Sequence, residues 1–449
     1  MHLLEALSPP LPATLCGRNA TNSLTHSNAS FAYTMNNRNL VLKIAAFALI
    51  GCFSTQAFAQ STPRQERLLN GLRVLMFSNP ASDKVSIKVR IHSGTSFDPQ
   101  GKEGVMALLA DSFFPTDASQ EFFKEDLGGS LSVTSTYDYI QIDASAKADE
   151  FLTLLEAVST AVSNPTIDKE TTPKLIARRL EKLKSLEADA AYIADKAAAK
   201  RLFGKFPYGR PELGTTETIA KLGFADLLEA KQRFLTSDNA TVSISGKIDP
   251  SLAYRAARRY LGSWLKSDRL IPSTFEQPAA PDAKMVFVSA PGESDTQLRF
   301  DLRGLARNDK DYPASQILTF VLEDRLSQNA ASGSATVRHC AHILPGSMVF
   351  SIQNSGEVAE NLPTLLLSKA ITNAEFDAAK SRMLASVKDI QIEDTWLNVD
   401  TFKLTSASDA LAALPAVTLA DVQRVAERLA KNPVVAVTVT KAEKAATTN

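Results

Sequence analysis

The chain has 449 residues, enough for two to three domains of typical size. Lys and Arg together number 49, as do Asp and Glu, and this balance argues against a nucleic-acid-binding protein that depends on a basic surface. Hydrophobic residues make up 44% and charged residues 22%, which excludes a largely disordered chain, and no apolar run is long enough to indicate a polytopic membrane protein.

The segment before residue 60 has the pattern of a targeting sequence. Residues 1–34 show no apolar periodicity, and we expect them to be untranslated or disordered, with Met35 as the start. A basic stretch, an apolar run over 44–53 and an Ala-x-Ala end then predict a signal peptide over 35–59, and hence an exported, most simply periplasmic, protein. The alternative is a lipoprotein-like box with lipidation at Cys52.

Strand-like and helix-like patterns alternate along the first half of the mature chain. Residues 85–91 alternate apolar and polar side chains, as a half-buried strand does, and a Ser-Gly turn then leads to a helix over 103–114. Residues 130–139 follow as another strand. Apolar residues at three- and four-residue steps predict the remaining helices, over 149–163, 173–203 and 224–235.

The second half repeats this order. Residues 296–302 alternate like a strand, and a charged turn leads to a helix from about Tyr312. The helix, turn and strand of 224–245 return at 419–440, with an offset of 195 residues and no gap. Self-similarity at a fixed offset is the mark of duplicated structural units.

The repetition predicts two homologous domains, 60–268 and 284–449, joined by a Pro-rich linker over 269–283. Strands followed by long helices favour an α+β fold, in which each domain is an antiparallel-rich sheet covered by helices.

Four stretches of the first half resemble the insulinase/pitrilysin family of zinc peptidases: residues 68–74, 93–104, 127–135 and 202–211. The resemblance covers the whole mature chain, because half-sized family members, such as mitochondrial processing peptidase subunits and paired bacterial periplasmic subunits, have two such domains. It implies a LuxS/processing-peptidase-like metallohydrolase fold in each half.

The family carries its zinc ligands as His-x-x-Glu-His on the helix after the second of these stretches, and its Glu deprotonates the metal-bound water. Aligned by Gly104 and Phe114, the two His positions fall on Ala107 and Asp111, and the Glu falls on Ala110.

The family's third ligand, a distal Glu, falls on Lys182, with Glu181 one residue away. The resemblance therefore implies that this chain has no catalytic residues and no metal site of its own. We expect no cofactor here, and zinc only in a catalytic partner.

Histidines elsewhere offer little replacement for these ligands. His92 ends a predicted strand and is interpreted as a surface residue. On a strand, Cys340 and His342 share one face while His339 points away, which favours an ordinary strand over a metal site.

The family also holds its substrate with an Arg and a Tyr in the second half. The corresponding stretch, aligned through Gly333, places Asn329 and Thr336 at these two positions. The resemblance therefore implies that this clamp is absent as well.

A basic run lies on the helix that should carry the distal ligand. It consists of Lys174, Arg178, Arg179, Lys182 and Lys184, and we interpret it as a solvated helix face with pairs between residues four apart.

Peptide binding requires none of the lost groups. By resemblance, Ser132, Val133 and Thr134 lie on an edge strand whose backbone can pair with an extended peptide. An ordinary strand paired on both sides is the alternative. Tyr137 and Tyr139 share a parity and are interpreted as core residues on one aromatic face.

These features favour a non-catalytic subunit of a periplasmic insulinase-like zinc peptidase. Such a subunit completes the substrate chamber of a zinc-bearing homologue and contacts peptides or unfolded polypeptide, without nucleic acid or an integral membrane segment. The first alternative is a stand-alone periplasmic peptide-binding or scaffold protein without a peptidase partner. The second is an active metallopeptidase with a rebuilt site around Asp111, Glu181 and His339.

Overall fold

The computed structural model describes residues 62–267, 278–281, 283–291, 295–329, 334–354, 358–388 and 390–441. The predicted signal peptide, Cys52 and residues 1–34 lie outside these ranges, as does most of the predicted linker. No helix within the described ranges is both long and apolar enough to cross a membrane.

The first half is built on a six-stranded sheet in the order β1-β2-β6-β3-β5-β4. Neighbouring strands are antiparallel except β2 and β6, which run parallel. The strands are β1 (Arg64–Arg67), β2 (Arg73–Ser78), β3 (Lys84–Ile91), β4 (Ser130–Ser135), β5 (Ile140–Lys147) and β6 (Ala240–Gly246).

The second half is built on a five-stranded sheet in the order β7-β11-β8-β10-β9. Again one pair, β7 with β11, is parallel and the others are antiparallel. The strands are β7 (Val286–Ala290), β8 (Gln297–Arg303), β9 (Ala335–Cys340), β10 (Ser347–Gln353) and β11 (Val434–Lys441).

The two sheets have the same topology once β1 is set aside, because β2, β6, β3, β5 and β4 match β7, β11, β8, β10 and β9 in order and direction. This confirms the predicted duplication and the α+β fold class. The sheets are mixed, with one parallel pair each.

Helices complete each half. Those of the first half are α1 (Val105–Asp111), α2 (Asp117–Glu121), α3 (Phe151–Ser163), α4 (Thr171–Glu187), α5 (Ala190–Phe203), α6 (Thr216–Ile219), α7 (Phe224–Phe234) and α8 (Pro250–Leu261). Those of the second half are α9 (Tyr312–Asn329), α10 (Leu362–Ser368), α11 (Asn373–Ser386), α12 (Ile392–Phe402), α13 (Ala407–Ala416) and α14 (Leu419–Leu429).

The predicted helical stretch over 173–203 consists of two helices, because the chain breaks between α4 and α5. Asp189 adopts an extended backbone there, and its carboxylate accepts a hydrogen bond from the N–H of Ala191 at 2.8 Å. This side chain caps a new helix, a role for which Asp is among the preferred residues. Because the chain changes direction at this break, α5 can extend to the second sheet and pack on it.

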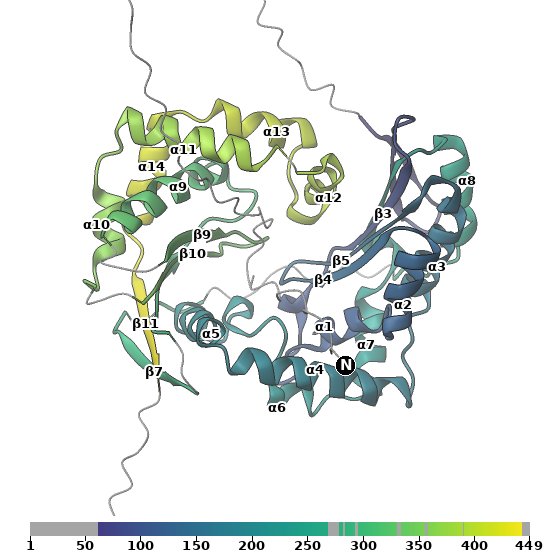
Figure 1. Ribbon diagram of the computed structural model, residues 1–449, viewed down its shortest axis with the longest axis horizontal. Helices are drawn as coiled ribbons and strands as arrows, with labels where there is room; N and C mark the ends of the chain where they lie inside the picture. Colours follow the sequence, from purple (N-terminus) through teal and green to yellow (C-terminus); the bar gives the residue numbers. More distant parts are fainter. Residues whose placement is uncertain are drawn as a thin grey trace, which may run out of the picture.

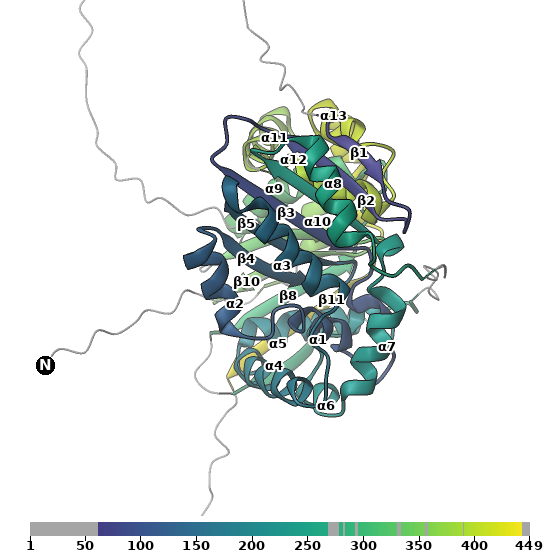
Figure 2. The ribbon, with the colours of Figure 1, turned by 90° about the vertical axis from the view of Figure 1, so that its right-hand side faces the viewer.

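Each half has its own hydrophobic core between its sheet and its helices. Helices α3 and α8 cover one face of the first sheet, and α9, with α11 and α14 behind it, covers one face of the second (Figures 1 and 2). On β3 the alternate residues Val85, Ile87, Val89 and Ile91 point into the first core and are at most 1% exposed.

Each half sends one helix onto the other half's sheet. Helix α5 packs on β8 and β11 of the second sheet, and α12 lies over the first sheet on the face opposite α3 and α8 (Figure 1). Alanines of α5 form a small apolar cluster with Val437 and Val439 of β11. The two sheets are therefore covered on both faces, which the half-buried pattern of 85–91 did not predict.

Helix α12 meets the polar side chains of the first sheet. Lys88 donates to Asp394 at 2.7 Å and Arg90 donates to Asn398 at 2.6 Å. His92 lies deeper, with its ring nitrogens 2.9 Å from hydroxyl groups of both halves. The prediction that His92 is a surface residue is therefore wrong, because α12 covers the polar face of β3.

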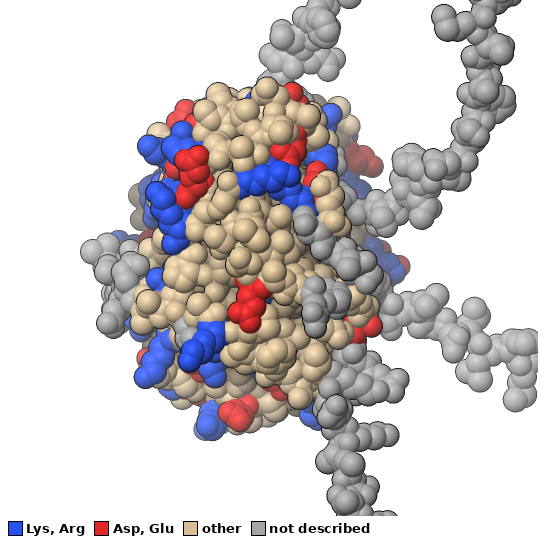
Figure 3. Space-filling view, turned by 90° about the vertical axis from the view of Figure 1, so that its left-hand side faces the viewer, with Lys and Arg blue, Asp and Glu red and all other residues tan. Residues whose placement is uncertain are grey.

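Charged side chains of both signs are mixed on the face shown in Figure 3, around a central area that carries few of them. No extended single-sign surface covers this side of the molecule. The mixture agrees with the equal numbers of basic and acidic residues in the sequence.

Candidate functional site

Helix α1 is held at its start by the side chain of Asp98. The carboxylate accepts hydrogen bonds from the backbone N–H groups of Gly104 at 2.6 Å and Met106 at 3.0 Å. These belong to the N–H groups that a helix start leaves unpaired. Arg210 donates to the carbonyl oxygen of Asp98 at 2.7 Å. Two of the stretches that resemble the family, 93–104 and 202–211, therefore meet at the start of this helix.

The positions of the family's two zinc-binding histidines and of its general-base Glu lie along α1. Ala107 and Ala110 are buried, with 0% and 4% of their surface exposed. Asp111 accepts hydrogen bonds from Nε of Arg179 at 2.9 Å and from Nη2 at 2.5 Å. The same Nη2 donates to the carbonyl oxygen of Ala107 at 3.0 Å. The Arg179 guanidinium therefore bridges the two positions at which the family has histidines.

These residues do not fit a zinc ion. Tetrahedral zinc takes three or four nitrogen, sulfur or carboxylate ligands. Here the two alanines offer none, and the carboxylate of Asp111 is bound to a guanidinium, whose charge repels a divalent cation. Across the described part of the chain, no three His, Cys, Asp or Glu side chains gather in a way that would hold a metal.

The expected third-ligand position offers no replacement. Lys182 lies on the same helix as Arg179, and desolvation, followed by the nearby charge of Arg179, lowers the pKa of its ammonium group. Glu181 is exposed and lies 3.6 Å from Lys184 in a surface ion pair. The position that supplies a carboxylate in the family thus carries a cation in this chain.

Arg179 corrects the interpretation of the basic run as a solvated face. Its side chain is only 4% exposed, whereas Arg178 and Lys184 point into solvent. The sequence already indicated that Arg179 is buried. It lies four residues after Leu175 and four before Leu183, and both leucines are buried on the same face of α4. An arginine on an apolar helix face needs a buried partner, and here the partner is Asp111.

The predicted peptide-binding residues Ser132, Val133 and Thr134 lie on β4, at the edge of the first sheet. Among the described residues β4 pairs only with β5, and Ser132 and Thr134 are exposed. An edge strand presents a row of backbone N–H and C=O groups to a further strand. The arrangement suits strand addition, and the role in peptide binding remains a prediction.

The two tyrosines expected to share one face lie in the turn after β4 and diverge. The ring of Tyr137 packs against Tyr208, with centroids 5.2 Å apart. The ring of Tyr139 lies under the guanidinium of Arg90 at 4.1 Å. The expectation of a single aromatic face is therefore wrong, because the residues leave the strand before their parity applies. Tyr137 is a core residue, as expected, whereas Tyr139 is half-buried.

The histidines of the second half are separated as their strand parity predicted. His339 points into the second half, where its Nδ1 lies 2.6 Å from the hydroxyl of Ser315 and its Nε2 accepts from the N–H of Leu305 at 2.9 Å. Burial lowers the pKa of His339 to about 3. Cys340 and His342 instead face α5, where they line a pocket.

The three residues of the hypothetical rebuilt site are not brought together. Asp111 is bound to Arg179 in the first half, Glu181 faces solvent, and both ring nitrogens of His339 are engaged in the second half. The predicted loss of the substrate clamp is not tested, because Gly333 lies outside the described residues. Thr336 lies on β9 opposite Ser351 of β10.

A duplicated mixed sheet with exchanged helices defines a two-domain α+β protein. The family model for insulinase (peptidase family M16) matches residues 73–216, and the model described as peptidase M16 inactive domain matches residues 221–383. The chain belongs to the insulinase family.

Curated relatives include two uncharacterized zinc proteases. YmxG of Bacillus subtilis is 24% identical over 200 residues, which cover 43% of this chain and 49% of that protein. A zinc protease of Rickettsia bellii is 20% identical over 208 residues, covering 45% of this chain and 50% of that protein. The chain thus spans about half the length of the curated relatives it matches.

Solved structures share the fold at low sequence identity. The peptidase M16 inactive domain from Pseudomonas fluorescens has a TM-score of 0.75 and 17% identity, over 85% of this chain and 98% of that one. A protease from Helicobacter pylori has a TM-score of 0.75 and 16% identity, over 84% of this chain and all of that one (100%). The periplasmic protease PqqL from Escherichia coli has a TM-score of 0.64 and 16% identity, over 85% of this chain but 48% of that one.

Proposed function

We propose that the protein is a non-catalytic subunit of an insulinase-type zinc peptidase, and that it completes the substrate chamber of a homologue bearing His-x-x-Glu-His. The observation that carries the proposal is the Arg179–Asp111 pair on an otherwise family-like scaffold. A chain that had merely lost its ligands would leave a gap at this place. Here the buried guanidinium of Arg179, bound to the half-buried carboxylate of Asp111, fills the gap.

The likeness to one half of a longer protease supports a paired arrangement. PqqL is a single chain of which this protein covers 48%, whereas it covers 92% of the first half of PqqL taken alone. This protein therefore has the fold of one half. A second half-sized chain is the natural complement, and the zinc ligands missing here are the chemistry that it would supply.

The edge strand β4 supports a role in holding the substrate. It packs beside α1, so a peptide added to β4 would run past the altered ligand helix. Hydrogen bonds to a strand edge require backbone groups only, so they survive the loss of zinc. We place the protein in the periplasm, on the strength of the secretory pattern over 35–59.

The proposal is tested with the mature chain purified alone and with a homologue that retains the zinc motif. We expect no peptide hydrolysis and no stoichiometric zinc from the isolated chain, a stable complex with the homologue, and faster cleavage by the complex than by the homologue alone. Hydrolysis with one zinc per isolated chain would overturn the proposal. The control is a variant of the homologue in which Ala replaces the catalytic Glu. Loss of cleavage by the complex with this variant assigns the activity to the homologue.

The exposed edge of β4 also favours the second candidate, a stand-alone peptide-binding protein. This candidate predicts a monomer or homodimer. Its test is the native mass of the protein as isolated from the periplasm. Binding of an extended peptide N-methylated at alternate residues measures strand addition in either case. Methylation of the amides that bond to β4 should weaken binding, while methylation of the intervening amides should not.

A further inference from the structure

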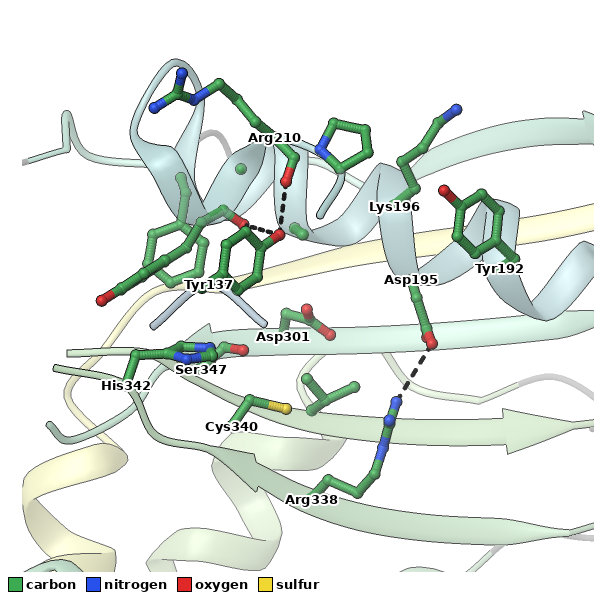
Figure 4. Close-up of a pocket in the computed structure, with 16 residues that line it drawn as sticks. Tyr137, Tyr192, Asp195, Lys196, Arg210, Asp301, Arg338, Cys340, His342 and Ser347 are labelled. Carbon is green, nitrogen blue, oxygen red and sulfur yellow. Dashed lines mark hydrogen bonds and ion pairs between the residues drawn. The ribbon is translucent and has the colours of Figure 1, made fainter. Parts of the chain in front are cut away.

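The charged groups between α5 and the second sheet balance one another (Figure 4). Asp195 of α5 accepts from Nε of Arg299 at 2.5 Å and from Nη2 of Arg338 at 3.4 Å. Asp301 of β8 is buried beside this group. Burial, followed by the charge of Asp195, raises the pKa of Asp301 to about 8, and the two arginines act against this shift. Two carboxyl groups thus meet two guanidinium groups.

The charges at the place of the family's zinc site do not balance in this way. The carboxylate of Asp111 faces two cations of α4, Arg179 and Lys182. The two cations stand three residues apart, a spacing that places side chains next to each other on a helix. One negative and two positive charges leave a net positive charge at this place.

Asp111 compensates Arg179 and contributes little to Lys182. Its Oδ2 accepts from both Nε and Nη2 of Arg179. In the described part of the chain, the ammonium of Lys182 has no hydrogen-bond or ion-pair partner. Desolvation, followed by the charge of Arg179, lowers the pKa of Lys182, and the attraction of Asp111 is the weakest of the three effects. Lys182 is therefore a cation whose charge the chain does not compensate.

The two cations keep hydrogen-bond donors for a ligand. Nη1 of Arg179 has no acceptor among the residues that the structure describes, whereas Nε and Nη2 are engaged. The side chain of Lys182 is exposed and that of Asp111 is 34% exposed, so solvent reaches the group. Arg179 lies deeper, so a ligand would meet Lys182 first. An anion would satisfy these donors and balance the charge.

The position of this group relative to β4 indicates which anion. Helix α1 lies between β4 and α4 and contacts both (Figures 1 and 2). A peptide added to the edge of β4 would therefore run beside the helix that carries Asp111. The anions that a peptide offers are carboxylates, at its C-terminus and on its Asp and Glu side chains.

We propose that the place of the family's zinc site is a carboxylate-binding site in this chain, where Lys182, supported by Arg179, holds a carboxylate of a peptide that lies along β4. The carboxylate is the C-terminus or an acidic side chain, since both present the same anion. Such a site rests on the peptide-holding role proposed above, and it adds a preference for anionic peptides to that role.

Calorimetric titration of the mature chain with two pairs of N-acetylated hexapeptides tests the site. The first pair has uncharged side chains and ends in a free carboxylate or in an amide. The second pair ends in an amide and carries Glu or Gln at one central position. We expect the anionic member of one pair to bind about five- to tenfold more tightly, because hydrogen bonds between charged groups are strong, while solvent screens part of the attraction at an exposed lysine.

The pair that shows the preference identifies the source of the carboxylate, the C-terminus for the first pair and an acidic side chain for the second. Equal affinities within both pairs would overturn the carboxylate site and leave strand addition to β4 intact. Binding of none of the four peptides would overturn the site together with the peptide-holding role. Neither result affects the separate test of a complex with a zinc-bearing homologue.

Three variants locate the site on α4. Lys182→Met removes the ammonium and keeps the length of the side chain, so it should abolish the preference, whereas Lys182→Arg should retain most of it. Lys184→Met is the matched control, because Lys184 lies on the same helix but is paired with Glu181 at 3.6 Å, and it should leave the preference unchanged. A full preference in Lys182→Met, or its loss in Lys184→Met, would contradict the assignment. Circular dichroism of each variant shows that the fold is retained.

Discussion

Arg179 and Asp111 join α4 to α1 through two hydrogen bonds to one carboxylate oxygen, at 2.9 and 2.5 Å. The arginine is 4% exposed and the aspartate 34%. Removing Asp111 would leave the buried guanidinium of Arg179 with little compensation. The pair therefore fixes two helices that zinc ligands would otherwise connect in the family.

Asp111→Ala should lower the free energy of unfolding by about 3 kcal/mol, because the Arg179 guanidinium would keep only the carbonyl of Ala107. Urea unfolding measures the change. Asp117→Ala is the control, since Asp117 meets Arg178 at 3.6 Å on the surface, and it should change the stability by less than about 0.5 kcal/mol. Equal effects of the two substitutions would refute a buried role for the Arg179–Asp111 pair.

Restoring the family's motif should not by itself restore zinc. In the triple variant Ala107→His, Ala110→Glu and Asp111→His, the guanidinium of Arg179 still lies beside the ligand positions and a third ligand is missing. We expect elemental analysis to find no stoichiometric zinc in the triple variant. Adding Arg179→Leu and Lys182→Glu removes the cation and supplies a carboxylate, and this variant should bind about one zinc per chain. Equal zinc content in both variants would contradict this prediction.

Asp301→Asn should stabilise the protein increasingly as the pH rises. The pKa of Asp301 is about 8 in the folded chain and near 4 when unfolded, so between these values the folded state binds more protons. The stability of the native protein therefore falls with rising pH, by up to about 1.4 kcal/mol per pH unit from this group. Denaturant unfolding at pH 5 and pH 8 measures the difference between variant and native chain, and a difference independent of pH would contradict the prediction.

Two half-buried histidines, each hydrogen-bonded through both ring nitrogens, should make the protein sensitive to acid. Burial lowers the pKa of His92 and of His339 to about 3, whereas both titrate near 6.5 when unfolded. The unfolded state thus binds more protons between these values, and stability is lost as the pH falls from about 6.5 towards 3. His92→Gln and His339→Gln should each reduce the pH dependence of the unfolding free energy. Because the two lie in different halves, their effects should add.

The contact of α12 with the first sheet depends on Asp394, which accepts from Lys88 at 2.7 Å and lies 3.5 Å from Arg90. Asp394→Ala would leave these two buried cations with fewer partners. We expect faster amide hydrogen exchange in α12 than in the native chain, with little change in α14, which belongs to the second core. Unchanged exchange in α12 would show that its position does not depend on this contact.

Much of the fold could be predicted because it depends on local patterns. The alternation of 85–91, which recurs at 296–302, and the helical spacing of 224–235, which returns with its strand at an offset of 195 residues, indicated two similar sheets with helices. The break at Asp189 was missed because residues 173–203 keep helical spacing on either side of it. A cap is a single side chain, and its signal is weak against a long apolar pattern.

By itself the sequence determined the duplicated architecture, and it identified Ala107, Ala110 and Asp111 as the residues at the family's catalytic positions. Only the tertiary structure decided that Arg179 occupies the vacated place, that α5 and α12 exchange between halves, and that Asp301 is buried near Asp195, Arg299 and Arg338. Periodicity reports which face of an element is apolar. The partner that meets a buried charge comes from residues far along the chain, which only the packing of the folded chain brings together.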